Sequence, residues 1–173
     1  MHPLTDTDLR ASFVNASRRE VAQATLPDLE PLDWERLDYL GWTDAKRPQM
    51  SYVVLPTGEG PVGIVLRTAA RSAVLRKAMC AWCQDIAATE DAHMYVARRA
   101  GALGRRGNTV GTLICADFRC SRNVRRTPSI EEVGSDDPVD RAALIERRIQ
   151  GLQERSARFA ANVCSESDED EPE

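Results

Sequence analysis

The sequence is short of the residues that common catalytic classes require. Among 173 residues it has two histidines, His2 at a terminus and His93 in an expected strand, where a histidine is more often structural than catalytic. It lacks the Gly-x-Ser-x-Gly, His-Glu-x-x-His and Gly-Lys-Ser/Thr motifs of hydrolases, metalloproteases and phosphate-binding loops. We therefore expect a protein that is not an enzyme.

Long apolar runs are also missing. The longest, at residues 52–55 and 63–66, fall far short of the ~18 residues that a membrane helix needs. The first residues lack the basic and apolar regions of a secretion signal. We expect a cytoplasmic protein with no membrane partner. In that reducing compartment, its five cysteines are more often metal ligands or free thiols than disulfides.

Lysine is nearly absent, since only Lys46 and Lys77 stand among the 23 basic residues, and the net charge of −4 is unevenly spread. Residues 165–173 hold six acids and no base, so we expect a disordered acidic tail after one domain at residues 1–164. Residues 93–126 carry a net charge of +7, from Asp117 and eight arginines: Arg98, Arg99, Arg105, Arg106, Arg119, Arg122, Arg125 and Arg126. The sequence predicts a basic surface and an acidic tail.

The N-terminal quarter has helical signals. Capping-box patterns at Thr5 and Ser17 predict two short helices, and Pro27 limits the second to about Ala24. Farther on, apolar residues at helical spacing predict another turn of helix, which Gly41-Trp42 ends: Trp34, Leu37 and Leu40.

Strand signals follow, and together with the helices they predict an α+β fold. Residues 50–55 and 62–67 are rich in β-branched side chains and predict an antiparallel hairpin, and residues 93–98 and 109–115 predict two further strands. The connection at residues 99–108 has three glycines and three arginines, so we expect a flexible basic loop.

The C-terminal third predicts helices. Residues 116–124 could form one, residues 127–137 are expected to be a polar linker, and Pro138 opens a long helix. Six residues of that helix share one stripe, which we expect to dock on the domain: Ile145, Ile149, Leu152, Ser156, Phe159 and Val163.

Four cysteines form two pairs, Cys80-Ala-Trp-Cys83 and Cys115-Ala-Asp-Phe-Arg-Cys120. A zinc ion takes four thiolates in a tetrahedron, and a knuckle, a hairpin and a ligand-bearing helix make a treble-clef zinc finger. Four protein ligands leave no open position, so this Zn²⁺ would be structural. The alternative is a thioredoxin-like redox pair, which prefers a βαβ unit that this sequence does not suggest. Cys164 is expected to have no role in the metal site.

Trp82 and the arginines of residues 99–108 are expected to lie on a related surface beside the metal. An aromatic ring beside guanidinium groups suits an acidic protein face or an RNA, where the ring stacks on a base. The alternative is that Trp82 packs over the metal site and the arginines are merely solvated.

Four segments make the sequence similar to a known family: Leu9-Arg-Ala-Ser-Phe-Val-Asn15, Leu37-Asp-Tyr-Leu-Gly-Trp42, Met79-Cys-Ala-Trp-Cys83 and Gly104-Arg-Arg-Gly-Asn-Thr-Val-Gly-Thr-Leu-Ile-Cys-Ala-Asp117. They resemble the elongation-factor-G-binding proteins, whose best-known members are the FusB-type fusidic acid resistance proteins. The similarity spans about residues 5–163. It implies a treble-clef domain that binds the C-terminal domains of elongation factor G and helps a drug-stalled factor leave the ribosome, without chemistry on the drug.

The resemblance also implies roles for single residues. Cys80, Cys83, Cys115 and Cys120 correspond to the zinc ligands. The partner-binding positions, with the neighbouring loop arginine included, would be Ala81, Trp82, Arg105, Arg106 and Thr109. We expect a monomer that binds elongation factor G, and the alternative partner is the ribosome or ribosomal RNA.

Overall fold

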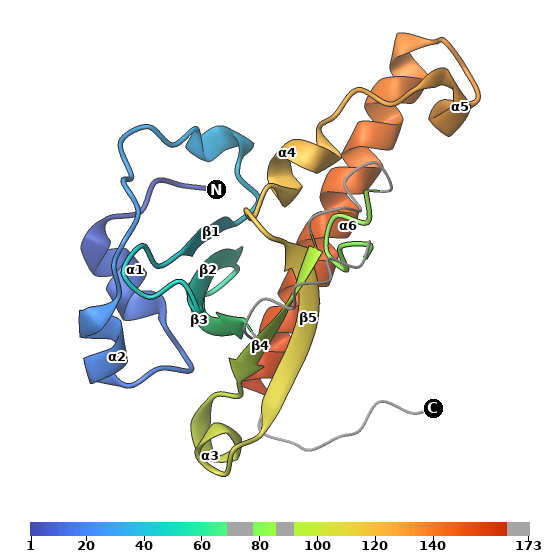
Figure 1. Cartoon of the computed structure of the whole chain (residues 1–173). Helices are drawn as coiled ribbons and strands as arrows, with labels where there is room; N and C mark the ends of the chain where they lie inside the picture. Colours follow the sequence, from blue (N-terminus) through green and yellow to red (C-terminus); the bar gives the residue numbers. More distant parts are fainter. Residues whose placement is uncertain (69–77, 86–91, 166–173) are drawn as a thin grey trace.

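The computed structural model describes residues 1–68, 78–85 and 92–165, and it has mixed α and β structure around one antiparallel sheet (Figure 1). The sheet has five strands in the order β1-β2-β3-β4-β5, so each strand pairs with its neighbours in sequence. Their bounds are β1 (Leu40–Thr43), β2 (Met50–Thr57), β3 (Gly60–Thr68), β4 (Ala92–Arg98) and β5 (Thr109–Cys115). The α+β prediction is confirmed.

The two predicted N-terminal helices are present as α1 (Asp6–Ser12) and α2 (Arg18–Gln23). Both begin with complete capping boxes. The Thr5 hydroxyl accepts a hydrogen bond from the Asp8 backbone N–H (3.2 Å), and the Asp8 carboxylate accepts one from the Thr5 N–H (2.8 Å). Each box satisfies two backbone groups that a helix start otherwise leaves unpaired.

Strand β1 corrects one prediction. The helical spacing after Trp34 yields only a single 3-10 turn, η1 (Trp34–Arg36), and from Leu40 the chain is extended. There Leu40 pairs with Val54 and Trp42 with Tyr52 on β2. Pairing with an apolar strand that lies ten residues farther along outweighs a local helical pattern, because the strand supplies hydrogen bonds as well as burial.

The two faces of the sheet carry different cores, because alternate residues of a strand point to opposite sides. Val53 and Leu55 of β2 belong to a cluster with the long helix α6 (Pro138–Cys164), whereas Tyr52 and Val54 belong to a cluster with the N-terminal segment. Figure 1 shows α1 and α2 beside β1–β3, and α6 running behind β4 and β5.

Helix α6 docks on the domain, as predicted. The stripe residues Leu152, Ser156, Phe159 and Val163 are buried, and Ile149 packs against the same cluster. The Ser156 hydroxyl donates to the Gln153 carbonyl oxygen (3.1 Å), which satisfies the one polar group in the stripe.

Three short helices differ from the predictions. The segment expected to be a flexible loop contains α3 (Gly101–Arg105), and the expected linker contains α5 (Ile130–Val133). Helix α4 (Cys120–Val124) is shorter than the expected 116–124, because Phe118 takes a left-handed backbone conformation with φ 56°. A capping box at Ser129 and Glu132 was a sequence signal for α5 that we missed.

The predicted acidic tail lies almost wholly outside the described residues, which end at Ser165. Within the described part of the chain, no helix combines the length and hydropathy needed to cross a bilayer.

Candidate metal centre

The first cysteine pair sits on a tight turn. The Cys83 backbone N–H points at the Cys80 Sγ (3.5 Å), and the Gln84 N–H donates to the Cys80 carbonyl oxygen (3.0 Å). Gln84 has a left-handed backbone, with φ 52°, which turns the chain away after the second sulfur. The Ala81 N–H donates to the Leu113 carbonyl oxygen (2.8 Å), so this knuckle is hydrogen-bonded to β5.

The second pair is positioned by the end of a strand and the start of a helix. Cys115 is the last residue of β5, and Cys120 is the first residue of α4. Between them the Phe118 N–H donates to the Cys115 carbonyl oxygen (2.9 Å), which closes a turn. The four intervening residues thus return the chain so that Cys120 faces the same point as Cys115.

The four sulfurs form a compact cluster. All lie within 4.8 Å of one another, and all four residues are buried. Two cross-pairs, Cys80 Sγ to Cys120 Sγ and Cys83 Sγ to Cys115 Sγ, are each 3.6 Å apart. Four sulfurs around one zinc ion at ~2.3 Å stand about 3.8 Å apart, whereas a disulfide needs ~2.05 Å. The spacing fits a tetrahedral metal site to which both cysteine pairs contribute.

Electrostatics favours a cation here too. The pKa of Cys80 lies well below the ordinary thiol value, because its sulfur accepts hydrogen bonds from Cys115 and Cys120. The pKa of Cys120 lies well above it, because its hydrogen bonds to Cys115 and Cys80 hold its proton and burial adds to the shift. A buried cluster cannot hold four thiolates unaided, but a divalent cation allows all four to ionise. The residues therefore fit a structural zinc ion.

An amide supports the cluster from outside the ligand set. The Asn123 Nδ2 on α4 lies 3.4 Å from the Cys115 Sγ and 3.9 Å from the Cys83 Sγ. Such N–H donors reduce the charge density on ligand sulfurs and fix their orientation. Asn123 was not among our predicted site residues.

Trp82 corrects the predicted partner surface. Its side chain is only 1% exposed, and its ring lies 4.9 Å from that of Tyr39 and 5.6 Å from that of Phe159, measured between centroids. The residue shares a core cluster with the cysteines, so the alternative of packing beside the metal site is confirmed. The knuckle turns this large apolar side chain inward, where it loses the most contact with water.

Two of the arginines after Cys115, Arg125 and Arg126, are held by buried carboxylates. Arg125 forms an ion pair with the buried Asp38, and Arg126 bridges Asp85 (3.1 Å) and Glu132 (2.7 Å). The pKa of Glu132 lies well below its usual value, because Arg126 donates hydrogen bonds to its carboxylate and the Ser129 backbone adds another. These arginines tie the metal-bearing segment to the residues between η1 and β1, to the end of the knuckle and to α5.

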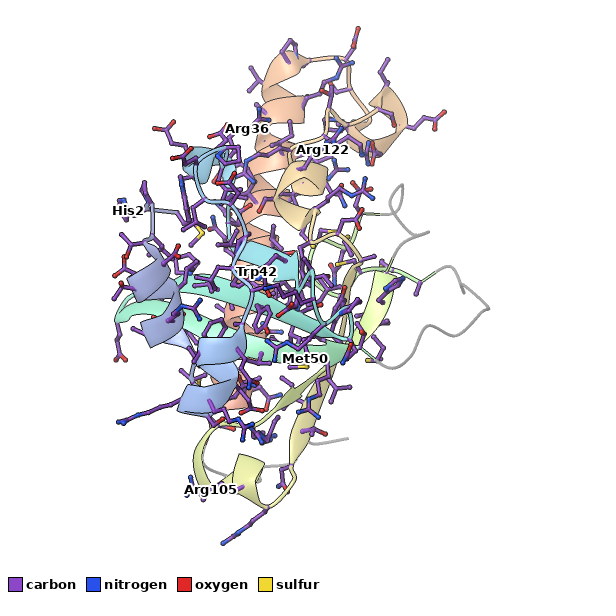
Figure 2. The ribbon with its side chains drawn as sticks, turned by 60° about the vertical axis from the view of Figure 1, so that its left-hand side comes forward. His2, Arg36, Trp42, Met50, Arg105 and Arg122 are labelled. Carbon is purple, nitrogen blue, oxygen red and sulfur yellow. The ribbon has the colours of Figure 1, made fainter. Side chains whose placement is uncertain are left out.

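The other arginine positions lie far from the metal. Arg105, Arg106 and Thr109 are exposed at the opposite end of the β4–β5 hairpin, where Figure 2 shows Arg105 at the tip. The seven residues of β5 separate that tip from Cys115 by roughly 20 Å, at about 3.3 Å per residue. The expectation that the loop arginines lie beside the metal is wrong. Of the predicted contact residues near the cysteines, Ala81 is exposed on the knuckle.

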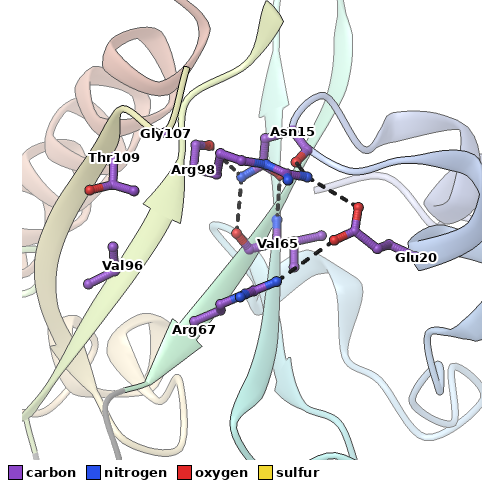
Figure 3. Close-up of a pocket in the computed structure, with 8 residues that line it drawn as sticks. All are labelled: Asn15, Glu20, Val65, Arg67, Val96, Arg98, Gly107 and Thr109. Carbon is purple, nitrogen blue, oxygen red and sulfur yellow. Dashed lines mark hydrogen bonds and ion pairs between the residues drawn. The ribbon is translucent and has the colours of Figure 1, made fainter. Parts of the chain in front are cut away.

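A second feature escaped the sequence analysis. A cavity of about 160 Å³ lies where the N-terminal segment meets β3, β4 and β5 (Figure 3). Eight residues line it: Asn15, Glu20, Val65, Arg67, Val96, Arg98, Gly107 and Thr109. Of these, Thr109 was a predicted contact. Asn15 stands in one of the family-like segments, but no local pattern joined it to the others.

Comparison with known proteins gives one finding. The family described as FBP C-terminal treble-clef zinc-finger matches residues 8–163. Neither the comparison with curated proteins nor the comparison with solved structures finds a match. The matched range covers both cysteine pairs, the whole sheet and almost all of α6, and it agrees with the four-sulfur geometry. The chain therefore belongs to the FBP C-terminal treble-clef zinc-finger family.

Proposed function

We propose that this protein is a non-enzymatic zinc protein that binds elongation factor G and promotes its release from the ribosome. The observation that carries the proposal is the family match over residues 8–163, whose treble clef has its four cysteines in place. The partner is inferred from the resemblance of the sequence to elongation-factor-G-binding proteins. A factor stalled by fusidic acid would be released in the same way, which would give tolerance to the drug.

The metal centre supports a structural role for zinc. Its four sulfurs lie within 4.8 Å of one another, enough ligands to fill a tetrahedral zinc ion, and all four cysteines are buried. Catalytic zinc needs a position open to water or substrate, which a closed four-thiolate site does not offer. In this proposal zinc holds the knuckle, β5 and α4 in one rigid arrangement, and the partner binds elsewhere on the surface.

The surface best suited to a protein partner is one side of the β4–β5 hairpin. Here Met94 pairs with Leu113, Val96 with Gly111, and Arg98 with Thr109. Helix α6 packs on the opposite side, and the N-terminal segment contacts β1–β3, so Met94 remains 48% exposed. We name this side the open hairpin face: Met94, Val96, Arg98, Thr109, Gly111 and Leu113.

The open hairpin face joins the partner positions that remain exposed. At one end, Ala81 is hydrogen-bonded to Leu113, and at the other end Thr109 leads to Arg105 and Arg106. An apolar middle with a basic end is typical of a surface for an acidic protein. We therefore place the proposed contact along the whole face rather than around the metal.

Titration calorimetry of the zinc-loaded protein against purified elongation factor G tests the proposal. We expect micromolar or tighter binding, and faster release of the factor from ribosomes with fusidic acid present. The absence of binding at tens of micromolar would contradict the proposal. Growth of cells that express the protein, with and without fusidic acid, then tests tolerance separately.

An RNA- or ribosome-binding zinc module is the second candidate. It is favoured by Arg105 and Arg106, whose guanidinium groups have no hydrogen-bond or ion-pair partner within the described residues. Arginine contacts to phosphate release counterions, so binding to RNA would weaken steeply with salt. Binding to naked ribosomal RNA that free elongation factor G does not reduce would favour this candidate. Either function places a monomer in the cytoplasm, where ribosomes work.

A further inference from the structure

The cavity of Figure 3 lies at one border of the open hairpin face. Three residues belong to both, namely Val96, Arg98 and Thr109, so a chain bound along the face would reach the cavity directly. On its other side the cavity is bounded by the side chain of Asn15 and by β3, through Val65 and Arg67. The cavity therefore opens onto the surface that we propose for the partner.

One wall of the cavity is held by three hydrogen bonds of the Asn15 side chain. Its Nδ2 donates to the carbonyl oxygens of Val65 (3.0 Å) and Arg98 (2.8 Å), and its Oδ1 accepts from the Val65 N–H (2.8 Å). These three bonds fix the N-terminal segment against β3 and β4 at the point where the strands diverge. The space beside them is thus preformed, which reduces the entropic cost of binding.

Two guanidinium groups in the cavity share one carboxylate. The Arg98 Nη2 lies 3.2 Å from the Glu20 Oε2, whereas the Arg67 Nη2 lies 3.9 Å from the Glu20 Oε1, too far for a hydrogen bond. The Arg67 side chain is 68% exposed. The cavity therefore has a net charge of +1, and Arg67 has donors available for a second anionic group.

Glu20 does not leave to make room for that group. Its Oε2 accepts a hydrogen bond from the Ser17 backbone N–H (2.8 Å), so the carboxylate is also the cap of α2. The same hydrogen bond lowers the pKa of Glu20 below its usual value, which keeps the group charged. An incoming anion must therefore bind on the side of Arg67 that faces away from Glu20.

The residues that line the cavity favour one class of anion over another. Val65 and Val96 present apolar surface, which suits the methylene groups of a glutamate or aspartate side chain, and the Thr109 hydroxyl can donate at the rim. A nucleic-acid backbone prefers several uncompensated cations, and this cavity offers a net charge of only +1. A volume of about 160 Å³ accommodates one side chain.

We propose that this cavity receives one acidic side chain of the protein partner, whose carboxylate pairs with Arg67 while its stem packs on Val65 and Val96. The inference rests on the proposed function, since it names the chemistry by which the partner would be held. The family-like contact position Thr109 then forms part of a receptor for a carboxylate. Arg67 is the diagnostic residue, because Arg98 also anchors the Asn15 carbonyl oxygen (3.1 Å) and its loss would disturb the fold.

Calorimetry with elongation factor G tests the proposal in the full zinc-loaded chain. We expect Arg67→Ala to weaken binding about fivefold to tenfold, as the loss of one charge-assisted contact does, and Arg67→Lys to restore part of it. The control is Arg36→Ala, which removes an exposed arginine of η1 remote from the cavity and should change affinity less than about twofold. If Arg67→Ala binds as tightly as the wild type, the cavity proposal is overturned and the proposed function stands.

A second arm separates failure of the cavity from failure of the partner. Backbone amide NMR shifts of Val96, Gly107 and Thr109 are followed while a hexaglutamate peptide or a uridine decamer is added. The peptide should shift these amides in the wild type and not in Arg67→Ala, whether or not elongation factor G binds. Shifts caused by the decamer alone would overturn the proposal in favour of RNA, and no shift with either probe would overturn it outright.

Discussion

The β4–β5 hairpin carries four arginines near each of its ends, and the two sets have different surroundings. Beyond the metal end lie Arg119, Arg122, Arg125 and Arg126, and around the tip lie Arg98, Arg99, Arg105 and Arg106. By sequence alone the two sets are one cluster of charge +7. In space they are about a strand's length apart.

Buried carboxylates distinguish Arg125 and Arg126 from Arg105 and Arg106, whereas Arg98 near the tip is paired with Glu20 (3.2 Å). At the metal end, the side chains of Asp38 and Asp85 are 1% and 5% exposed, and they hold Arg125 and Arg126 in place. At the tip, Arg105 and Arg106 are exposed, and among the described residues no carboxylate engages them. A run of like charges is therefore structural where buried acids face it, and it is available to a partner where they do not.

The metal end should depend on its ligand sulfurs more than on any other group. We expect Cys115→Ser to abolish zinc binding and to unfold the knuckle and α4, because structural zinc contributes folding free energy directly, on the order of 10 kcal/mol in zinc-finger peptides. Metal analysis and hydrogen exchange measure both effects. The matched control is Cys164→Ser, which removes an exposed thiol outside the cluster. A Cys115→Ser protein with an unchanged melting profile would contradict this account.

The two arginine sets should differ in stability when one member of each is truncated. Arg125→Ala leaves the Asp38 carboxylate buried, and among the described residues only the Gln153 side-chain amide (3.0 Å) still donates to it, so we expect a loss of roughly 3 kcal/mol in the free energy of unfolding. Arg105→Ala should cost less than about 0.5 kcal/mol. Chemical denaturation of both variants gives the comparison, and equal losses would show that burial of the partner is not what distinguishes the ends.

Burial on the side of the β4–β5 hairpin that faces α6 should also raise the pH at which a tyrosine ionises. Tyr95 is buried and donates to the Ala116 carbonyl oxygen (3.0 Å), and burial raises its pKa to about 12. Because the folded pKa exceeds the unfolded value of about 10, the stabilisation is fully present below pH 10 and is lost as the pH rises toward 12.

Tyrosinate absorbance measures this effect. The pKa of Tyr52 is likewise raised to about 12 by burial, and burial raises that of Tyr39 well above its ordinary value, so the native protein should show almost no phenolate at pH 10. The denatured chain should titrate near pH 10, and Tyr95→Phe should reduce the amount that ionises near pH 12. A phenolate that titrates near pH 10 in the native state would show that at least one of these three tyrosines is exposed to water.

The smallest effect on the fold is expected at the tip. Arg106→Ala should leave the midpoint of thermal unfolding within a degree or two, because a surface substitution usually costs less than about 0.5 kcal/mol. Under the proposed function it should nonetheless weaken binding to elongation factor G, by about twofold to fivefold for one rim charge. Calorimetry on the same samples separates the two readouts. A variant that binds normally would remove Arg106 from the contact surface.

Much of the secondary structure was predictable from the sequence, because its signals are local. The Thr5 and Ser17 capping boxes, the alternating strands and the stripe from Ile149 to Val163 each follow from a few neighbouring residues. The four-cysteine site was also predictable, although its halves lie 32 residues apart, because two closely spaced cysteine pairs are typical of a metal site.

Other features were not predictable from local patterns. Strand β1 exists because Trp42 pairs with Tyr52, and Trp82 is buried because Tyr39 and Phe159 arrive from distant segments. The cavity depends on Asn15 bonding to Val65, 50 residues away. Residue spacing within one segment does not predict which distant segment it will contact.

By itself the sequence determined the metal chemistry, the helix starts and the amount of positive charge, because each depends on residue type and short spacing. Only the tertiary structure decided where that charge is available. It paired Arg125 and Arg126 with buried acids, left Arg105 and Arg106 in solvent, and turned Trp82 inward. The physical reason is that burial and ion pairing depend on distances through space, which the fold sets by bringing distant segments together.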